Sequence, residues 1–452
     1  MLLRGRMDVR VRGPPIVRWM APKDRLEPGN DLRHRLGLFW STGVLLRQPD
    51  VFSFQSRCDA SALTIRGRRC DCCVLRKLGW TRRRARDWIK ARPEMPGGNP
   101  SLGIRPWARN RSPFTPPAKS VSRTMRKLEL TLACGRYDRT QPLLDGRVQP
   151  EGVDLTFLPL RPGETFWRML NHGEFDASEM SLSSYTILRS EGDTRFIAIP
   201  VFPSRVFRHS AVYVPADSNI ERPEDLKGKR VGVGDYQMTA AVWVRGFLTH
   251  EYGVTPNDIV WVTGKPIRSI KPPDGVRLEP IPADTTLEAM LERGEIDALM
   301  SVMIPEKFGK TIRRLFRDSR RIEIEYYNKT RIFPIMHTLV LKTSLYQEKP
   351  WLAVSLYHAF CRARDLAYQS MYDTDALSVS LPWVIHEVEA TRGIYGPQIW
   401  DYSIEGSLPT LNALVAYLDE QKLSRRRMNV EELFVPNISP GLADYLRATG
   451  ED

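Results

Sequence analysis

The chain has 452 residues, of which 42% are hydrophobic and 27% charged, so it is long enough to form two or three globular domains with apolar cores. Its formal net charge of +14 would point to a nucleic-acid or membrane partner if it were spread along the chain. However, residues 1–124 contain 27 Lys and Arg against 9 Asp and Glu, and residues 125–452 contain 40 against 44, which excludes a basic surface as a general property of the main segment.

Residues 1–124 show no sustained period of 2 or 3.6, because Pro, Gly and Arg interrupt every apolar run. Three interpretations apply: a nucleic-acid-binding arm, a disordered extension, or sequence upstream of a translation start at Met125. We favour the third, with the disordered extension as the alternative, because the strand pattern Lys127–Leu132 follows Met125 directly. Cys70, Cys72 and Cys73 crowd together in this leader without the second pair of ligands that a zinc site needs.

The sequence contains no convincing export or membrane signal. The apolar run Leu36–Leu46 lies too far from the patterned segment to be a secretory signal, and no stretch approaches the roughly 20 apolar residues that span a bilayer. Cys134 and Cys361 are expected to be lone thiols, which fits a reducing compartment. We therefore expect a cytoplasmic protein without membrane or nucleic-acid partners, and a homo-oligomer stays open.

An internal repeat indicates the architecture. Met169–Ala177 and Met290–Ala298 share the pattern M-L-x-x-G-E-[FI]-D-A, in which the glycine ends a helix and the last residues begin a buried strand. The two copies lie too far apart for a solenoid. They predict two similar α/β lobes, each with a helix that leads into a parallel strand.

A second correspondence predicts how the lobes are joined. Arg208–Val214 and Met336–Leu341 each have a short polar start followed by a strand, as expected for two strands that cross between lobes. We therefore predict a two-lobed, periplasmic-binding-protein-like (type II) cleft fold. Lobe 1 would comprise residues 125–210 and 335–452, the latter including C-terminal helices, and lobe 2 would comprise residues 211–334.

Two helices are predicted from the pattern of the later segments. In lobe 2, a strand and the loop 234–238 precede a helix from about Thr239 to Tyr252, whose N-terminus would favour an anion in the cleft. The Gly-x-Gly in this region lacks the third glycine of a dinucleotide site. In the C-terminal part, Trp351, Tyr357 and Phe360 keep helical spacing and predict a buried helix face.

Polar residues cluster at the predicted cleft edge and form the candidate site. They follow the first repeat strand, begin the two crossings, or lie at the start of the lobe 2 helix. They are Glu179, Ser181, Ser183, Arg205, Arg208, His209, Tyr236, Gln237, Arg245 and His337.

Each of these residues also has a purely structural interpretation. The arginines can form surface salt bridges, the histidines can be hydrogen-bonded core residues, and Ser181 or Ser183 can cap a helix. The functional interpretation gains weight because His209 and His337 occupy equivalent crossing positions. A facial metal triad of these histidines with Glu179 is an alternative that the spacing does not demand, so we expect no cofactor and no metal.

At these clusters the sequence resembles the 4,5-dihydroxyphthalate decarboxylase family. The segments that resemble it are "SEMSLSSYTILRSEGD", "FIAIPVFPSRVFRHSAVYV", "PEDLKGKRVGVGDYQMTAAVWVRG" and "FPIMHTLVLK". The resemblance runs from Met125 almost to the end of the chain. The element "PEDLKGKRVGV" is common to substrate-binding proteins, whereas "VFPSRVFRHS" and "YQMTAAVWVRG" are more specific.

The resemblance implies a cytoplasmic lyase that converts 4,5-dihydroxyphthalate to protocatechuate and carbon dioxide. In this interpretation Arg205 and Arg208 bind the carboxylates, and His209 or His337 protonates the ring. Glu179, Ser181 and Tyr236 would hold the catechol hydroxyls. The alternative function is a non-catalytic substrate-binding protein of an ABC-type transporter for a small organic anion.

Overall fold

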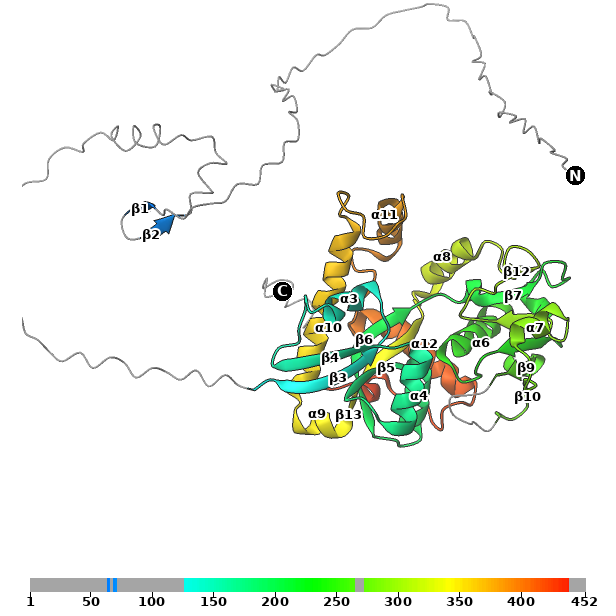
Figure 1. Cartoon of the computed structure of the whole chain (residues 1–452). Coiled ribbons are helices and arrows are strands. Elements are labelled where there is room, and N and C mark those ends of the chain that lie inside the picture. The colour runs from blue at the N-terminus through cyan, green and yellow to red at the C-terminus, as the bar shows by residue number, and fades with distance from the viewer. Residues whose placement is uncertain (1–62, 66–67, 71–125, 265–271, 439–452) are drawn as a thin grey trace, which may run out of the picture. The chain divides into compact units, whose positions relative to one another are not determined.

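The structure is a computed structural model that describes residues 63–65, 68–70, 126–264 and 272–438 (Figure 1). The chain divides into two units, residues 1–115 and 116–452. In the first unit, β1 (Leu63–Ile65) pairs antiparallel with β2 (Arg68–Cys70). The rest of the predicted leader lies outside the described residues.

Lobe 1 of the second unit is built on a five-stranded sheet with the order β4-β3-β5-β13-β6. The first three strands of this order are parallel, and β13 is antiparallel to both of its neighbours. Its strands are β3 (Leu128–Cys134), β4 (Val153–Pro159), β5 (Ala177–Ser181), β6 (Phe196–Arg205) and β13 (Ile335–Lys342). Its helices are α3 (Gln141–Leu144), α4 (Pro162–His172) and α5 (Leu182–Ser190).

Lobe 2 is built on a six-stranded sheet with the order β10-β9-β8-β11-β7-β12. Its strands are β7 (Val212–Pro215), β8 (Arg230–Val233), β9 (Val260–Thr263), β10 (Arg277–Pro280), β11 (Ala298–Met300) and β12 (Ile312–Arg314). Its helices are α6 (Thr239–Tyr252), α7 (Leu287–Glu292) and α8 (Ser319–Thr330). Helix α6 occupies the range that the sequence predicts.

Two chain segments cross between the lobes. The first runs from the end of β6 at Arg205 to the start of β7 at Val212, and the second from α8 to the start of β13 at Ile335. Both crossings leave from the sheet edge at which β3 and β5 end, because β6 is parallel to β5 and β13 is antiparallel to it. This topology, with its two α/β lobes, confirms the predicted fold class.

The sequence repeat has the same structural role in both lobes. In lobe 1, Gly173 ends α4 in the left-handed region (φ 56°), and Asp176 then accepts hydrogen bonds from the N–H and hydroxyl of Thr131 on β3 (2.9 and 2.8 Å). In lobe 2, Asp297 accepts the backbone N–H of Arg230 at the start of β8 (2.8 Å). Each aspartate thus fixes the register of the neighbouring parallel strand. This shared role explains why both copies of the motif contain an aspartate after the helix-ending glycine.

The C-terminal helices cover lobe 1 and connect it to lobe 2. They are α9 (Thr343–Glu348), α10 (Trp351–Met371), α11 (Val384–Tyr395) and α12 (Leu408–Glu420). Helix α11 lies at one end of the long α10, and α12 packs on both α5 of lobe 1 and α6 of lobe 2 (Figure 1). Tyr357 and Phe360 of α10 are buried as predicted, whereas Trp351 is 44% exposed.

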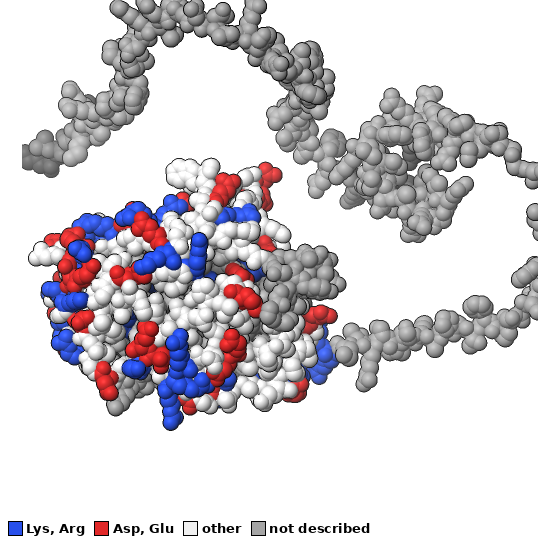
Figure 2. All heavy atoms as spheres, turned by 180° about the vertical axis from the view of Figure 1, so that it is seen from behind, with Lys and Arg blue, Asp and Glu red and all other residues white. Residues whose placement is uncertain are grey.

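The charged side chains of the second unit are mixed in sign. On the face shown in Figure 2, Lys and Arg alternate with Asp and Glu and form no continuous field of one sign. This agrees with the near-neutral count for residues 125–452. None of the described helices is both long and apolar enough to cross a bilayer.

The aspartates of the repeat generate a stability prediction. Asp176→Ala and Asp297→Ala should each lower the free energy of unfolding by about 1–3 kcal/mol, because each leaves a backbone N–H without its partner. Asp217→Ala, at an exposed turn, is the control and should change it by less than about 0.5 kcal/mol. Urea unfolding measures all three, and equal effects in the control and the two variants would contradict the assigned role.

Candidate active site

The candidate site lies at the sheet edge from which both crossings leave. The ends of β3 and β5 and the start of β13 meet there, and the lobe 2 loop between β8 and α6 faces them. Ligands of α/β proteins bind at the carboxyl ends of parallel strands, so the topology alone marks this edge.

The carboxylate of Glu179, on β5, is fully buried and is the centre of the site. Its Oε1 accepts hydrogen bonds from the Tyr137 hydroxyl (2.6 Å) and from Nδ1 of His337 (2.6 Å). Its Oε2 accepts one from the backbone N–H of Gly135 (2.7 Å), and the Cys134 thiol lies 3.5 Å from the same oxygen. Three strong donors therefore hold both oxygens of a single buried carboxylate.

The strand register brings these residues together. In the antiparallel pair of β13 and β5, His337 lies opposite Ser181, and Leu339 lies opposite Glu179. Alternate residues of a strand share one face of the sheet, so His337 and Glu179 are diagonal neighbours on that face. Tyr137 reaches the same carboxylate from the loop that follows β3.

The local electrostatics fix the protonation of this cluster. Burial acts to raise the pKa of Glu179, but the His337 ring, the Tyr137 hydroxyl and the Gly135 N–H favour the carboxylate, and its pKa is lowered overall. Burial and the Glu179 charge raise the pKa of Tyr137 above its ordinary value, so it remains a neutral donor. Because Glu179 is ionised, Nδ1 of His337 bears the proton that it donates.

His337 has one ring nitrogen left for a ligand. Its Nε2 makes no hydrogen bond within the described residues, and the side chain is 17% exposed. The ring packs edge-to-face against Phe166 of α4, with 4.9 Å between the ring centroids. The imidazole is thus held by Glu179 on one side and an aromatic ring on another, and offers Nε2 to the cleft.

Arg208 supplies a positive charge beside this histidine. It lies in the first crossing, and its Nε is 3.3 Å from Sδ of Met336, the residue before His337. No carboxylate of the described residues forms an ion pair with Arg208, although the nearby charge of Glu323 acts to raise its pKa. Burial lowers the pKa of Arg208 to about 10, so the guanidinium remains charged at neutral pH without a carboxylate partner.

The predicted serines connect the two lobes. The Ser183 hydroxyl donates to the carbonyl of Gln237 (2.6 Å), and its backbone N–H donates to the hydroxyl of Thr239 (3.1 Å). The Ser181 hydroxyl lies 2.9 Å from that of Thr239 and also accepts the N–H of Ser184, which caps α5. The helix-capping interpretation of Ser181 is therefore confirmed, and both serines hold α5 against the start of α6.

His209 does not join the site. Its ring stacks on Phe247 with 4.0 Å between centroids and contacts the edges of Phe316 and Tyr326. It is 1% exposed, neither ring nitrogen has a hydrogen-bond partner within the described residues, and burial lowers its pKa to about 4. The prediction that His209 is a catalytic residue is therefore wrong, because His209 is a neutral residue of the aromatic core. The alternative metal triad is excluded as well, because it required the His209 ring beside Glu179.

Three other predicted residues, Arg205, Tyr236 and Arg245, are buried. Arg205 is buried against the C-terminal segment, where it donates to the Ser407 hydroxyl and a backbone carbonyl. Arg245 donates to Gln421 and to the carbonyl of Tyr236 (2.8 Å each), and its guanidinium covers the Tyr236 ring at 3.8 Å. These arginines and the tyrosine are packed in the interior, so we correct their assignment as substrate ligands.

Lobe 2 presents an exposed apolar segment to the same cleft edge. Strands β8 and β11 are parallel, so the loop after β11 lies beside the loop that Ser183 contacts. The N–H of Ser301 bonds to the carbonyl of Ala211 in the first crossing (3.0 Å). The next residues, Val302–Ile304, are between 51% and 69% exposed, although all three are hydrophobic.

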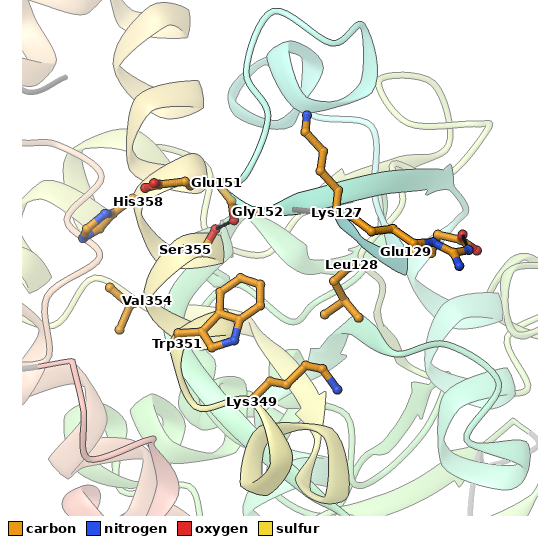
Figure 3. Close-up of a pocket in the computed structure, with 11 residues that line it drawn as sticks. Lys127, Leu128, Glu129, Glu151, Gly152, Lys349, Trp351, Val354, Ser355 and His358 are labelled. Carbon is orange, nitrogen blue, oxygen red and sulfur yellow. Dashed lines mark hydrogen bonds and ion pairs between the residues drawn. The ribbon is translucent and has the colours of Figure 1, made fainter. Parts of the chain in front are cut away.

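A separate hollow of about 1040 Å³ lies on the outer side of lobe 1 (Figure 3). Leu128 and Trp351 line it, with Lys127 and Lys349 at its edges, where β3 begins and α10 starts. None of the predicted site residues lines this hollow, and it accounts for the exposure of Trp351.

Tyr137 is a residue of the candidate site that the sequence did not predict. It follows the predicted strand Lys127–Leu132 by five residues and the observed β3 by three, which is where ligand-binding side chains of α/β folds occur, and that position was the available signal. Nothing in the sequence indicates that its hydroxyl reaches Glu179, because that contact joins residues 42 positions apart.

Comparison with known proteins gives two kinds of relative. The family model of the periplasmic substrate-binding protein of phosphonate ABC transporters matches residues 137–269. A protein of Comamonas testosteroni named 4,5-dihydroxyphthalate decarboxylase is 41% identical over 322 residues, which cover 69% of this chain and 98% of that protein. A protein of the same name from Pseudomonas putida is 41% identical over 213 residues, covering 45% of this chain and 83% of that protein.

Among solved structures, the periplasmic aliphatic sulphonate binding protein of Escherichia coli is similar with a TM-score of 0.42 and 15% identity. The match covers 68% of this chain and 92% of that protein.

The buried carboxylate generates a stability prediction. Glu179→Gln should lower the free energy of unfolding at pH 7 by about 2 kcal/mol or more, because the charge that His337 and Tyr137 stabilise is lost. The lowered pKa of Glu179 means that its contribution is complete above its ordinary value of 4.5 and disappears as the pH falls through the lowered value.

Denaturant unfolding at a series of pH values measures the difference in the free energy of unfolding between wild type and Glu179→Gln. The difference should be constant near neutrality and shrink below pH 4.5. The exposed control, Glu405→Gln, should show little effect at any pH. A difference between wild type and Glu179→Gln that grew on acidification would contradict an ionised Glu179.

Proposed function

The chain belongs to the 4,5-dihydroxyphthalate decarboxylase family and is a carboxy-lyase, and we propose that its Glu179–His337 pair delivers the proton that replaces the departing carboxylate. The observation that supports this assignment is the 2.6 Å contact between the buried, ionised Glu179 and Nδ1 of His337, which leaves Nε2 free at the cleft. The substrate is 4,5-dihydroxyphthalate, and the products are protocatechuate and carbon dioxide.

The reaction exchanges one carboxylate for one proton. A pair of ring π electrons forms the new C–H bond, the bond between the same ring carbon and the carboxylate then breaks, and its electron pair restores the aromatic ring as carbon dioxide leaves. Direct loss of carbon dioxide would leave a poorly stabilised aryl carbanion. Protonation of the ring carbon first avoids it, because the hydroxyl para to that carbon supplies electron density.

His337 is the proton donor in this scheme. In its charged form Nε2 bears the proton to be delivered, and Glu179 stabilises the imidazolium through Nδ1. Tyr137 and Gly135 keep the carboxylate ionised and fixed, so Glu179 positions the histidine and does not itself contact substrate. After transfer the neutral ring keeps its bond to Glu179 and regains a proton from solvent.

Arg208 binds a substrate carboxylate. Its guanidinium has no carboxylate partner within the described residues, and a planar fork matches a carboxylate in two parallel hydrogen bonds. Its contact with Met336 places this charge next to the strand that bears His337. The exposed segment Val302–Ile304 supplies an apolar wall for the aromatic ring from lobe 2.

The two serines predicted to bind substrate receive a different role. Ser181 and Ser183 already bond to Thr239 and Gln237 of lobe 2, so we assign them to holding the lobes together around the substrate. The second candidate function, a transporter's binding protein, is favoured only by the family model that matches residues 137–269. Binding of 4,5-dihydroxyphthalate without turnover by the purified chain would establish that alternative.

The role of His337 predicts a loss of turnover. His337→Asn should lower kcat for carbon dioxide release by about 10²–10⁴-fold with KM changed little, because the amide keeps the size of the site but cannot supply the proton. Stopped assays of carbon dioxide and ultraviolet absorbance measure both constants. The matched control is His209→Phe, which preserves the aromatic packing and should keep near wild-type kcat. Equal losses in the two variants would refute the assignment of His337.

The role of Arg208 predicts a loss of affinity. Arg208→Gln should raise KM for 4,5-dihydroxyphthalate by about 10–100-fold, which corresponds to one lost charged hydrogen-bond pair. Steady-state kinetics measure the change, and added salt should weaken wild-type binding more than that of the variant. The exposed Arg136→Gln is the control and should leave KM within a factor of about two. An unchanged KM in Arg208→Gln would remove this residue from the site.

A further inference from the structure

A second cavity adjoins the Glu179–His337 cluster but is lined by other residues. It has a volume of about 230 Å³, is partly open to solvent, and is bordered by α10, α11 and the short helix η1 (Asp138–Thr140). Most of its wall is apolar and comes from Ala367, Met371, Val388 and the indole of Trp400. This volume is below the range of drug-sized pockets and suits a molecule with a single ring.

One end of this cavity is positively charged and deeply placed. Arg364 and Arg139 line it, and their side chains are only 7% and 14% exposed. Arg364 uses Nε for Asp365 (2.8 Å) and Nη1 for the carbonyl of Trp400 (3.3 Å). Its Nη2 makes no hydrogen bond within the described residues and remains as a donor.

The hydroxyl of Tyr368 lies at the same end of the cavity and has no hydrogen-bond partner within the described part of the chain. Burial and the Asp138 charge raise the pKa of this hydroxyl to about 12, and the nearby charges of Arg364, Arg139 and Arg205 oppose the rise. Three cations and one carboxylate therefore act on this neutral hydroxyl in a largely apolar space, and this excess of positive charge favours a bound anion.

The two carboxylates of the cavity wall do not cancel this charge. Asp138 is 44% exposed on its side chain and pairs with Arg139 at 2.8 Å. Glu387 is 63% exposed and pairs with Arg320 of α8 at 2.8 Å. A third carboxylate, Asp365, is 36% exposed and pairs with Arg364 at 2.8 Å. The negative charge at the cavity is therefore more exposed to solvent, and more strongly screened, than the positive charge of Arg139 and Arg364.

We propose that this cavity is a second binding site, for a one-ring aromatic monocarboxylate, with the ring against the apolar wall and the carboxylate on Tyr368 and Arg364. The product of the proposed reaction belongs to this chemical class, but the site itself is independent of that reaction. It also adjoins the active site, because the Arg139 guanidinium lies between the rings of Trp400 (4.0 Å) and Tyr137 (4.4 Å), and Tyr137 holds Glu179.

Benzoate is the probe that tests this site, with isothermal titration calorimetry on the full chain. Wild type and Arg208→Gln should bind benzoate at this site equally, because Arg208 belongs to the cleft. Tyr368→Phe should weaken binding about tenfold through the lost hydroxyl. Val388→Trp should abolish it by filling the cavity. Benzamide, which has the same shape without the charge, should bind at least about tenfold more weakly than benzoate.

Turnover of 4,5-dihydroxyphthalate separates this proposal from the preceding one. Tyr368→Phe and Val388→Trp should both retain wild-type kcat, which also shows that they fold. Benzoate binding that survives both substitutions, or that disappears in Arg208→Gln alone, would overturn the second site and leave the proposed reaction unaffected. A benzamide affinity equal to that of benzoate would overturn the anionic part of the proposal.

Discussion

The buried carboxylate of Glu179 is the constraint on which the rest of the active site depends. Removing a charged group from water costs several kcal/mol unless strong donors replace the solvent. Here three donors come from two elements: the N–H of Gly135 and the hydroxyl of Tyr137 after β3, and the ring of His337 on β13. Satisfying one anion therefore fixes the relative positions of β3, β5 and β13 and, with them, the direction in which His337 faces.

The two-lobed topology explains why only one of the two crossing histidines reaches this anion. The second crossing delivers His337 into β13, which lies beside β5 in the lobe 1 sheet. The first crossing turns through a short helix before β7, so His209 already belongs to lobe 2 and packs among its aromatic side chains. Ser181, at the end of β5, contacts Thr239 and thereby brings lobe 2 against the site. The two lobes are therefore in direct contact beside the proposed substrate cleft.

The sequence predicted the fold well because the relevant signals are local and repeated. Helix, glycine, aspartate and strand occur in one short motif in each lobe, and the motif's aspartates, Asp176 and Asp297, make equivalent strand contacts. The site was predicted only in part. Arg208 and His337 lie at the cleft, but Arg205 has similar sequence surroundings and is buried against the C-terminal segment, whose approach no local pattern reveals. Tyr137 was missed for the same reason, since its partner is distant in sequence.

The most direct test of this account is a crystal structure of the His337→Asn variant with 4,5-dihydroxyphthalate bound. The account predicts one substrate carboxylate paired with Arg208 and the ring carbon of the departing carboxylate about 3.5 Å from the side chain at position 337. Substrate bound outside the inter-lobe cleft, or with that ring carbon turned away from position 337, would contradict the claim that the Glu179–His337 pair delivers the proton.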